Sequence, residues 1–157
     1  MKALDRALNY LNTKPRSRAQ VELYLRDRGF GDEEIDEAIE QLQEYRYIDD
    51  LSFARMHLEL GFEKGRGMLR IRRELAEKGV DHDIVERAIA EMEDIPDEYE
   101  MALEIAENAA YSLLAGRELS ELDYGEKQKL RRKIAGRLAT RGYTGETAYS
   151  AAKKVIK

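Results

Sequence analysis

The sequence of 157 residues contains no cysteine and no tryptophan, and it has only two prolines and two histidines. The absence of cysteine excludes a disulfide framework, a cysteine-based zinc site and a thiol nucleophile. Neither His57 nor His82 stands in a Glu-x-x-His or His-x-x-x-His motif of the kind that zinc and di-iron sites use on helices. No stretch approaches the roughly 20 apolar residues of a membrane span. The start of the chain also lacks the apolar core of a signal peptide. These absences predict a cytoplasmic protein with no membrane partner, no cofactor and no metal.

Helical periodicity is the main pattern that is present. Apolar residues recur at i, i+3, i+4 and i+7 in Leu4–Leu11, Ile35–Leu42 and Tyr99–Ala106. No apolar/polar alternation bounded by hairpin turns predicts a strand. The expected N-caps are Ser17, Asp32, Asp50, Asp81, Asp123 and Thr144.

Three glycines, Gly29, Gly79 and Gly142, reveal an internal repeat when they are set in register. A basic residue directly precedes each glycine, a leucine lies four residues before it, and a β-branched residue lies eight before it. These columns are Arg28, Lys78 and Arg141; Leu25, Leu75 and Leu138; and Val21, Ile71 and Ile134. Each copy predicts a helix, a corner where φ is positive, and a further helix, preceded by an amphipathic segment.

The register predicts an all-α fold of three tandem three-helix repeats forming an elongated, curved array. We place the repeats at residues 1–48, 49–95 and 96–157. The third copy is longer, and we expect its additional residues near Gly116–Tyr124, in the connection between its first two helices.

Charge is distributed unevenly over these helices. The chain carries 27 Lys and Arg against 32 Asp and Glu, for a formal net charge of −5. The second helices, Lys14–Arg28, Lys64–Lys78 and Lys127–Arg141, carry net charges of +3, +4 and +7. The third-helix segments Asp32–Asp50 and Asp81–Glu100 each carry −8. Clustered cations of this kind can meet phosphates even in an acidic protein. The competing interpretation is a set of solvated helix faces.

The basic residues recur at helical spacing. Arg66, Arg70 and Arg73 share one face of the expected helix Lys64–Lys78. Lys133 and Arg137 lie on one face of the expected helix Lys127–Arg141. The candidate contact residues for a polyanion are Arg66, Arg70, Arg73, Lys78, Arg131, Arg132, Lys133, Arg137 and Arg141.

No catalytic constellation emerges from the sequence. We interpret Asp49–Asp50 as a helix cap rather than an acid/base or metal pair. Gly65–Gly67 is too short for a phosphate loop and lacks its Gly-Lys-Ser/Thr ending. Tyr45 and Tyr47 are expected to pack rather than to stack on bases. The sequence therefore predicts a protein that is not an enzyme.

Three segments resemble the RecX regulatory proteins. Tyr47–Ala54, which reads YIDDLSFA, is similar to the family's Tyr-Leu-Asp-Asp…Phe-Ala segment, and Gly67–Val80 is similar to its Gly…Arg-Ile…Glu-Leu…Lys-Gly-Ile stretch. Ser17–Leu25 with Arg28–Phe30 resembles the counterpart in the first unit. The similarity is specific in the first two repeats and loose in the third.

The resemblance implies tandem three-helix repeats that bind the RecA filament on single-stranded DNA. It implies inhibition of RecA ATPase, filament extension and strand exchange in recombination and SOS repair, without a catalytic site. The candidate cations would then face filament-bound DNA or an acidic filament surface. Two alternatives stay open: a stand-alone helical module that binds DNA directly, and a generic helical scaffold that binds protein. Self-repulsion of an acidic surface favours a monomer.

Overall fold

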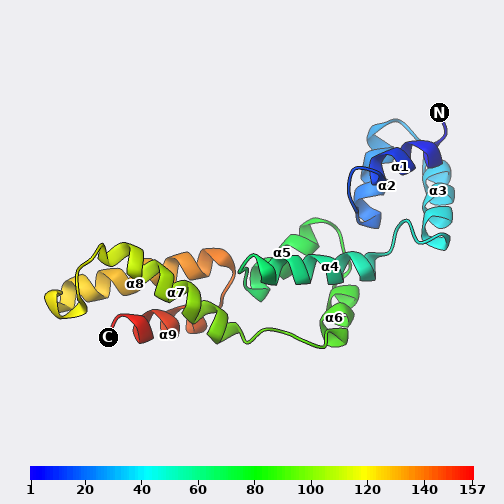
Figure 1. Ribbon diagram of the computed structural model, residues 1–157. Coiled ribbons are helices and arrows are strands. Elements are labelled where there is room, and N and C mark those ends of the chain that lie inside the picture. Colours follow the sequence, from blue (N-terminus) through cyan, green and yellow to red (C-terminus); the bar gives the residue numbers. More distant parts are fainter. The chain divides into compact units, whose positions relative to one another are not determined.

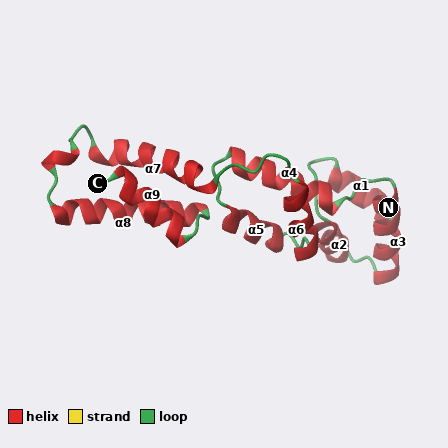
Figure 2. Ribbon diagram, turned by 90° about the horizontal axis from the view of Figure 1, so that it is seen from below, coloured by secondary structure: helices red, strands yellow, loops and turns green.

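The computed structural model describes residues 1–157 and is built from α-helices joined by short loops (Figure 1). The helices are α1 (Ala3–Leu11), α2 (Arg18–Asp27), α3 (Asp32–Glu44), α4 (Asp50–Glu63), α5 (Met68–Glu77), α6 (His82–Glu91), α7 (Glu98–Leu114), α8 (Tyr124–Arg141) and α9 (Gly145–Val155). A short 3-10 turn, η1 (Leu119–Glu121), lies between α7 and α8. No strand is present (Figure 2), so the all-α prediction is confirmed.

The apolar columns of the repeat form the interior. Val21 and Leu25 of α2 are fully buried in one core that α1 and α3 complete. Ile134 and Leu138 of α8 are fully buried in a second core that α7 and α9 complete. Ile71 and Leu75, at the same register positions of α5, are also fully buried. The three-helix repeat inferred from the glycine register is therefore present in the fold.

Two compact units make up the chain. The first contains residues 1–59 and 73–92, and the second contains residues 60–72 and 93–157. The division passes through α4 and α5, in the middle of the second predicted repeat. The repeat boundaries at residues 48 and 95 therefore stay a prediction.

The three predicted glycine corners share one geometry. Gly29, Gly79 and Gly142 have φ values of +88°, +78° and +104°. In each corner the residue after the glycine donates its N–H to the carbonyl of the leucine four residues before the glycine, at 3.0–3.2 Å. This six-to-one bond, with left-handed backbone at the glycine, defines the Schellman helix end.

Most predicted N-caps are confirmed. Ser17 forms the full capping box with Gln20, and the Asp123 carboxylate accepts the Glu126 N–H at 2.8 Å. Asp81 and Thr144 also cap their helices. Two assignments are wrong by one residue, because Gly31 rather than Asp32 precedes α3 and Asp49 rather than Asp50 caps α4.

The second helix of the third repeat is longer than those of the first two, with 18 residues against 10 in each. The register position equivalent to Ser17 and Gly67 is Leu130, but α8 begins at Tyr124. Residues 115–123 connect α7 to α8, and this connection is longer than the corresponding ones at residues 12–17 and 64–67. Another part of the additional sequence forms further turns of α8. This extension is capped by Asp123 and carries an ion pair between Arg117 and Glu126 at 3.2 Å.

Candidate functional site

The outer face of α8 presents a row of cations. Arg132, Lys133, Arg137 and Arg141 are exposed, whereas Ile134 and Leu138 hold the opposite side of the helix in the core. Like charges on one helix face repel one another, and an anionic partner would relieve that repulsion. We call Arg132, Lys133, Arg137 and Arg141 the α8 basic face.

Two further residues belong to this face and were missed from the sequence. Lys129 is exposed one turn before Lys133 and continues the row at four-residue spacing. Gly136 is exposed among the cations, and a Cβ atom added there would meet nothing within 4 Å. Glycine inside a helix costs roughly 1 kcal/mol relative to alanine. Lys129 lies within the segment Lys127–Arg141, and its four-residue spacing from Lys133 is the signal that could have identified it. The repeat register gave no reason to mark Gly136.

Arg131 differs from its neighbours. Its side chain is partly buried, its Nε donates to the Ile156 carbonyl at 2.7 Å, and its Nη1 donates to the Gln128 amide oxygen at 3.2 Å. The Ile156 carbonyl lies at the end of α9, where helix carbonyls lack partners within the helix. The structure thus gives Arg131 an internal role, and its contact with a partner stays a prediction.

The candidate cations of α5 are less exposed than those of α8. Arg73 is exposed, but Arg66, Arg70 and Lys78 are partly buried. Arg66 and Arg70 flank the point where the end of α8 meets the start of α5. Their surroundings make them residues of that junction as well as candidate contacts.

Glycine backbones form this junction. The Gly67 N–H donates to the Arg141 carbonyl at 2.8 Å, and the Leu69 N–H donates to the Gly142 carbonyl at 3.2 Å. The Tyr143 hydroxyl donates to the Gly65 carbonyl at 2.9 Å. A Cβ atom on Gly67 would lie 2.3 Å from the Gly142 oxygen. The approach is therefore possible only without a side chain, and it satisfies the carbonyls at the end of α8.

The first unit contains a related junction. The Ser17 hydroxyl donates to the Lys78 carbonyl at 2.5 Å, and a Cβ atom on Gly79 would lie 2.3 Å from the Ala19 Cβ. The Arg18 N–H also donates to the Asp50 carboxylate at 2.8 Å. The two junctions are therefore alike. The glycine corner at the end of α8 rests on the start of α5, and the glycine corner at the end of α5 rests on the start of α2.

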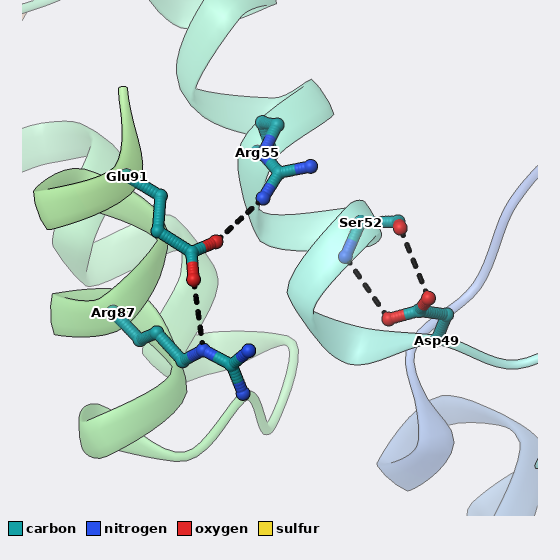
Figure 3. A network of polar contacts seen from close by, with 5 residues as sticks. All are labelled: Asp49, Ser52, Arg55, Arg87 and Glu91. Atoms are coloured by element: carbon teal, nitrogen blue, oxygen red, sulfur yellow. Dashed lines mark hydrogen bonds and ion pairs between the residues drawn. The ribbon is translucent and has the colours of Figure 1, made fainter. Parts of the chain in front are cut away.

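The adjacent carboxylates of Asp49 and Asp50 both serve such local contacts. Asp49 accepts the backbone N–H of Ser52 at 3.1 Å and its hydroxyl at 3.0 Å (Figure 3), and the backbone bond lowers the Asp49 pKa. Burial raises the pKa of Asp50, although its bond from Arg18 opposes the shift. Asp49 thus caps α4, and Asp50 binds the start of α2. Both contacts agree with the interpretation of the pair as a helix cap rather than an acid/base or metal pair.

A second set of contacts joins α4 to α6. Arg55 and Arg87 both point toward the Glu91 carboxylate, at 2.7 and 3.0 Å (Figure 3). The hydrogen bond from Arg87 is the larger cause, and that from Arg55 the smaller, of a lowered Glu91 pKa. The two arginines are therefore engaged within the unit.

The prediction that Tyr45 and Tyr47 pack is wrong, because they are 72% and 59% exposed. Arg46 between them has a φ of +61°, so the chain reverses direction between the two tyrosines at the end of α3. Tyr10 and Tyr24 pack instead, with ring centroids 4.0 Å apart and planes inclined by 3°. The guanidinium groups of Arg16 and Arg28 cover the outer faces of these rings at 4.2 and 4.4 Å.

No three acidic or histidine side chains lie close enough to share a metal ion. None of the helices combines the length and the apolarity that a membrane span requires.

Comparison with known proteins assigns the family. Residues 3–42 match the family model described as RecX, first three-helix domain, and residues 49–89 match that of the second three-helix domain. The regulatory protein RecX of Prosthecochloris aestuarii is 33% identical over 147 residues, which cover 93% of this chain and 88% of the relative. The chain belongs to the RecX family. Its sequence resemblance to RecX proteins is thereby confirmed.

Other RecX proteins extend the comparison. A regulatory protein RecX of Listeria monocytogenes is 32% identical over 152 residues. The aligned region covers 96% of this chain but only 53% of that longer relative. The crystal structure of RecX from Lactobacillus salivarius superposes with a TM-score of 0.77 at 25% identity, covering 98% of this chain and 94% of that one. A second RecX crystal structure, at 20% identity and a TM-score of 0.73, shares the fold. A regulatory role follows from membership of the RecX family.

Proposed function

We propose that this RecX-family chain regulates the RecA recombinase by binding the RecA filament on single-stranded DNA. Binding would inhibit RecA ATPase, filament extension and strand exchange during recombination and SOS repair. The observation that carries the proposal is the α8 basic face in a member of a family of regulatory proteins.

The charge distribution supports two kinds of contact. The exposed cations of α8 suit filament-bound DNA or an acidic part of the filament. The exposed carboxylates of α3 suit a basic part of a RecA protomer, because α3 carries seven acidic residues and no basic one. A chain that contacts DNA and protein together would resist the rearrangements on which ATP turnover and extension depend.

The experiment that tests this proposal measures RecA ATPase on single-stranded DNA while the wild-type chain is added in substoichiometric amounts. We expect a concentration-dependent fall in the rate, because one bound chain would affect more than one protomer. An unchanged rate, with the chain shown to be folded by circular dichroism, would contradict the proposal. An unchanged rate accompanied by strong binding to duplex DNA would instead indicate a stand-alone DNA-binding module.

Gly136 provides a second prediction, in which stability and binding change in opposite directions. The Gly136→Ala variant should be about 1 kcal/mol more stable toward unfolding, since alanine favours the helix and its Cβ enters open space. If a partner approaches the α8 backbone at this point, the variant should also bind the filament several-fold more weakly. Urea unfolding and fluorescence anisotropy measure the two effects.

Gly145 supplies the matched control. It begins α9, and an added Cβ there also meets nothing within 4 Å. The Gly145→Ala variant should therefore bind as tightly as the wild type. If Gly136→Ala is stabilised but binds the filament with unchanged affinity, no partner approaches the helix backbone there.

A further inference from the structure

The first unit contains a cleft that the regulatory function does not explain. It has a volume of about 600 Å³ and lies among the end of α1, the loop before α2, the loop after α3 and the start of α4. Leu8, Leu11, Phe53 and Met56 contribute an apolar lining. Phe53 is almost fully buried, whereas Met56 is 42% exposed. The cleft therefore offers an open apolar surface large enough for an aromatic ring.

Cations line the same cleft. Lys14, Arg16 and Arg46 contribute three positive charges, and Asp49 contributes one negative charge. The Asp49 carboxylate is already engaged by the backbone N–H and hydroxyl of Ser52. The lining therefore carries a net positive charge, although residues 1–100 of the chain carry a net charge of −9.

Two side chains of the lining supply binding groups. The Arg16 guanidinium lies over the Tyr10 ring, 4.2 Å from its centroid, with one nitrogen 3.4 Å from the Thr13 hydroxyl, and its buried Nε has no hydrogen-bond partner. Tyr47 also lines the cleft and is 59% exposed. Its position follows from the left-handed backbone at Arg46, a conformation that costs a non-glycine residue roughly 1–2 kcal/mol.

We propose that this cleft binds one nucleotide of a single-stranded nucleic acid, with its base against Tyr47 and the apolar lining and its phosphates against Lys14, Arg16 and Arg46. Cations beside an exposed ring are the two components of single-strand binding sites. A base is free to enter such a cleft only when it is unpaired. This inference rests on the proposed function, because it adds to the α8 basic face a second DNA contact that lies far from α8 in the sequence.

The test uses the full chain and a fluorescein-labelled oligothymidylate of about ten nucleotides, a length within the range of known single-strand sites. We expect Tyr47→Ala and Lys14→Glu each to weaken binding about tenfold at low salt, because each removes one component of the site. Tyr111→Ala and Lys2→Glu are the matched controls, since both residues are exposed and lie outside the cleft. The controls should bind as the wild type does.

Photo-crosslinking tests the unmodified chain as well. An oligonucleotide containing 5-iodouracil should crosslink to Tyr47, which trypsin releases in the peptide Tyr47–Arg55. Unchanged affinity in the cleft variants, or crosslinks only elsewhere, would overturn the inference. A loss of RecA inhibition with intact oligonucleotide binding would also overturn it and assign the cleft to an acidic protein segment. If the wild-type chain does not bind the oligonucleotide, the proposed nucleotide site is wrong. The proposed regulation of RecA is unaffected by that result if the chain still inhibits RecA ATPase.

Discussion

Replacing Gly142 by alanine is expected to lower the free energy of unfolding by about 3 kcal/mol. The glycine has a φ of +104°, where a side chain is disfavoured, and its new Cβ would lie 2.3 Å from the Arg70 Cβ and 2.7 Å from the Arg70 nitrogen. The α8 corner would have to move away from the start of α5, with loss of the bonds that Gly67 and Leu69 donate. Urea denaturation followed by circular dichroism measures the effect.

Gly29 separates the two causes of that loss. It occupies the same kind of corner with a φ of +88°, but an added Cβ there meets nothing within 4 Å. The Gly29→Ala variant should lose only the roughly 1–2 kcal/mol that the left-handed conformation costs. Equal losses in the two variants would show that the close approach at Gly142 contributes nothing to stability.

Reversing three charges of the α8 basic face should abolish most filament binding without unfolding the chain. We expect the variant Arg132→Glu, Lys133→Glu and Arg137→Glu to bind the RecA–DNA filament on the order of a hundredfold more weakly. The slope of log affinity against log salt should fall by about three, one for each lost phosphate contact. Stability should change little, because the three side chains are exposed and the ion pair of α8 involves Glu126 instead. Anisotropy titrations at several salt concentrations measure both quantities.

The control for this variant carries the same change in net charge. Lys153, Lys154 and Lys157 are exposed on or beside α9, and their replacement by glutamate should leave the salt slope near that of the wild type. Equal losses for the two variants would mean that only net charge matters. Arg131 is left unchanged in both variants because its bond to the Ile156 carbonyl supports the end of α9.

The repeat was predictable because its signals are local. A positive φ at the corner requires glycine, and an apolar residue at a fixed distance from that corner must face the core, as Val21, Ile71 and Ile134 do. The same reasoning placed all the extra residues of the third repeat in the connection between its first two helices, whereas some of them extend α8. It did so because the turns gained by α8 carry polar residues without apolar periodicity, and the cap at Asp123 was the only sign of an earlier start.

The candidate site was predictable only in part, because exposure depends on contacts between distant segments. Spacing placed Arg66, Arg70 and Arg73 on one face, but Arg66 and Arg70 are partly buried, and Arg70 lies against the α8 corner. The role of Arg131 depends on the position of Ile156, which lies 25 residues later. Tyr47 looked like a packing residue until the left-handed backbone of Arg46 placed it on a cleft. None of these relationships leaves a periodic trace in the sequence.

Because the chain contains no cysteine, a single cysteine carrying a photoreactive benzophenone can report directly on the proposed contact. Ala139 is an exposed position on α8 beside the basic face, and Ser112 is an exposed position on α7 that serves as the control. With the RecA filament on single-stranded DNA, we predict adducts to RecA or DNA from Ala139→Cys and few from Ser112→Cys. Adducts from Ser112→Cys alone, or from neither variant under conditions where the chain inhibits RecA, would contradict binding through the α8 basic face.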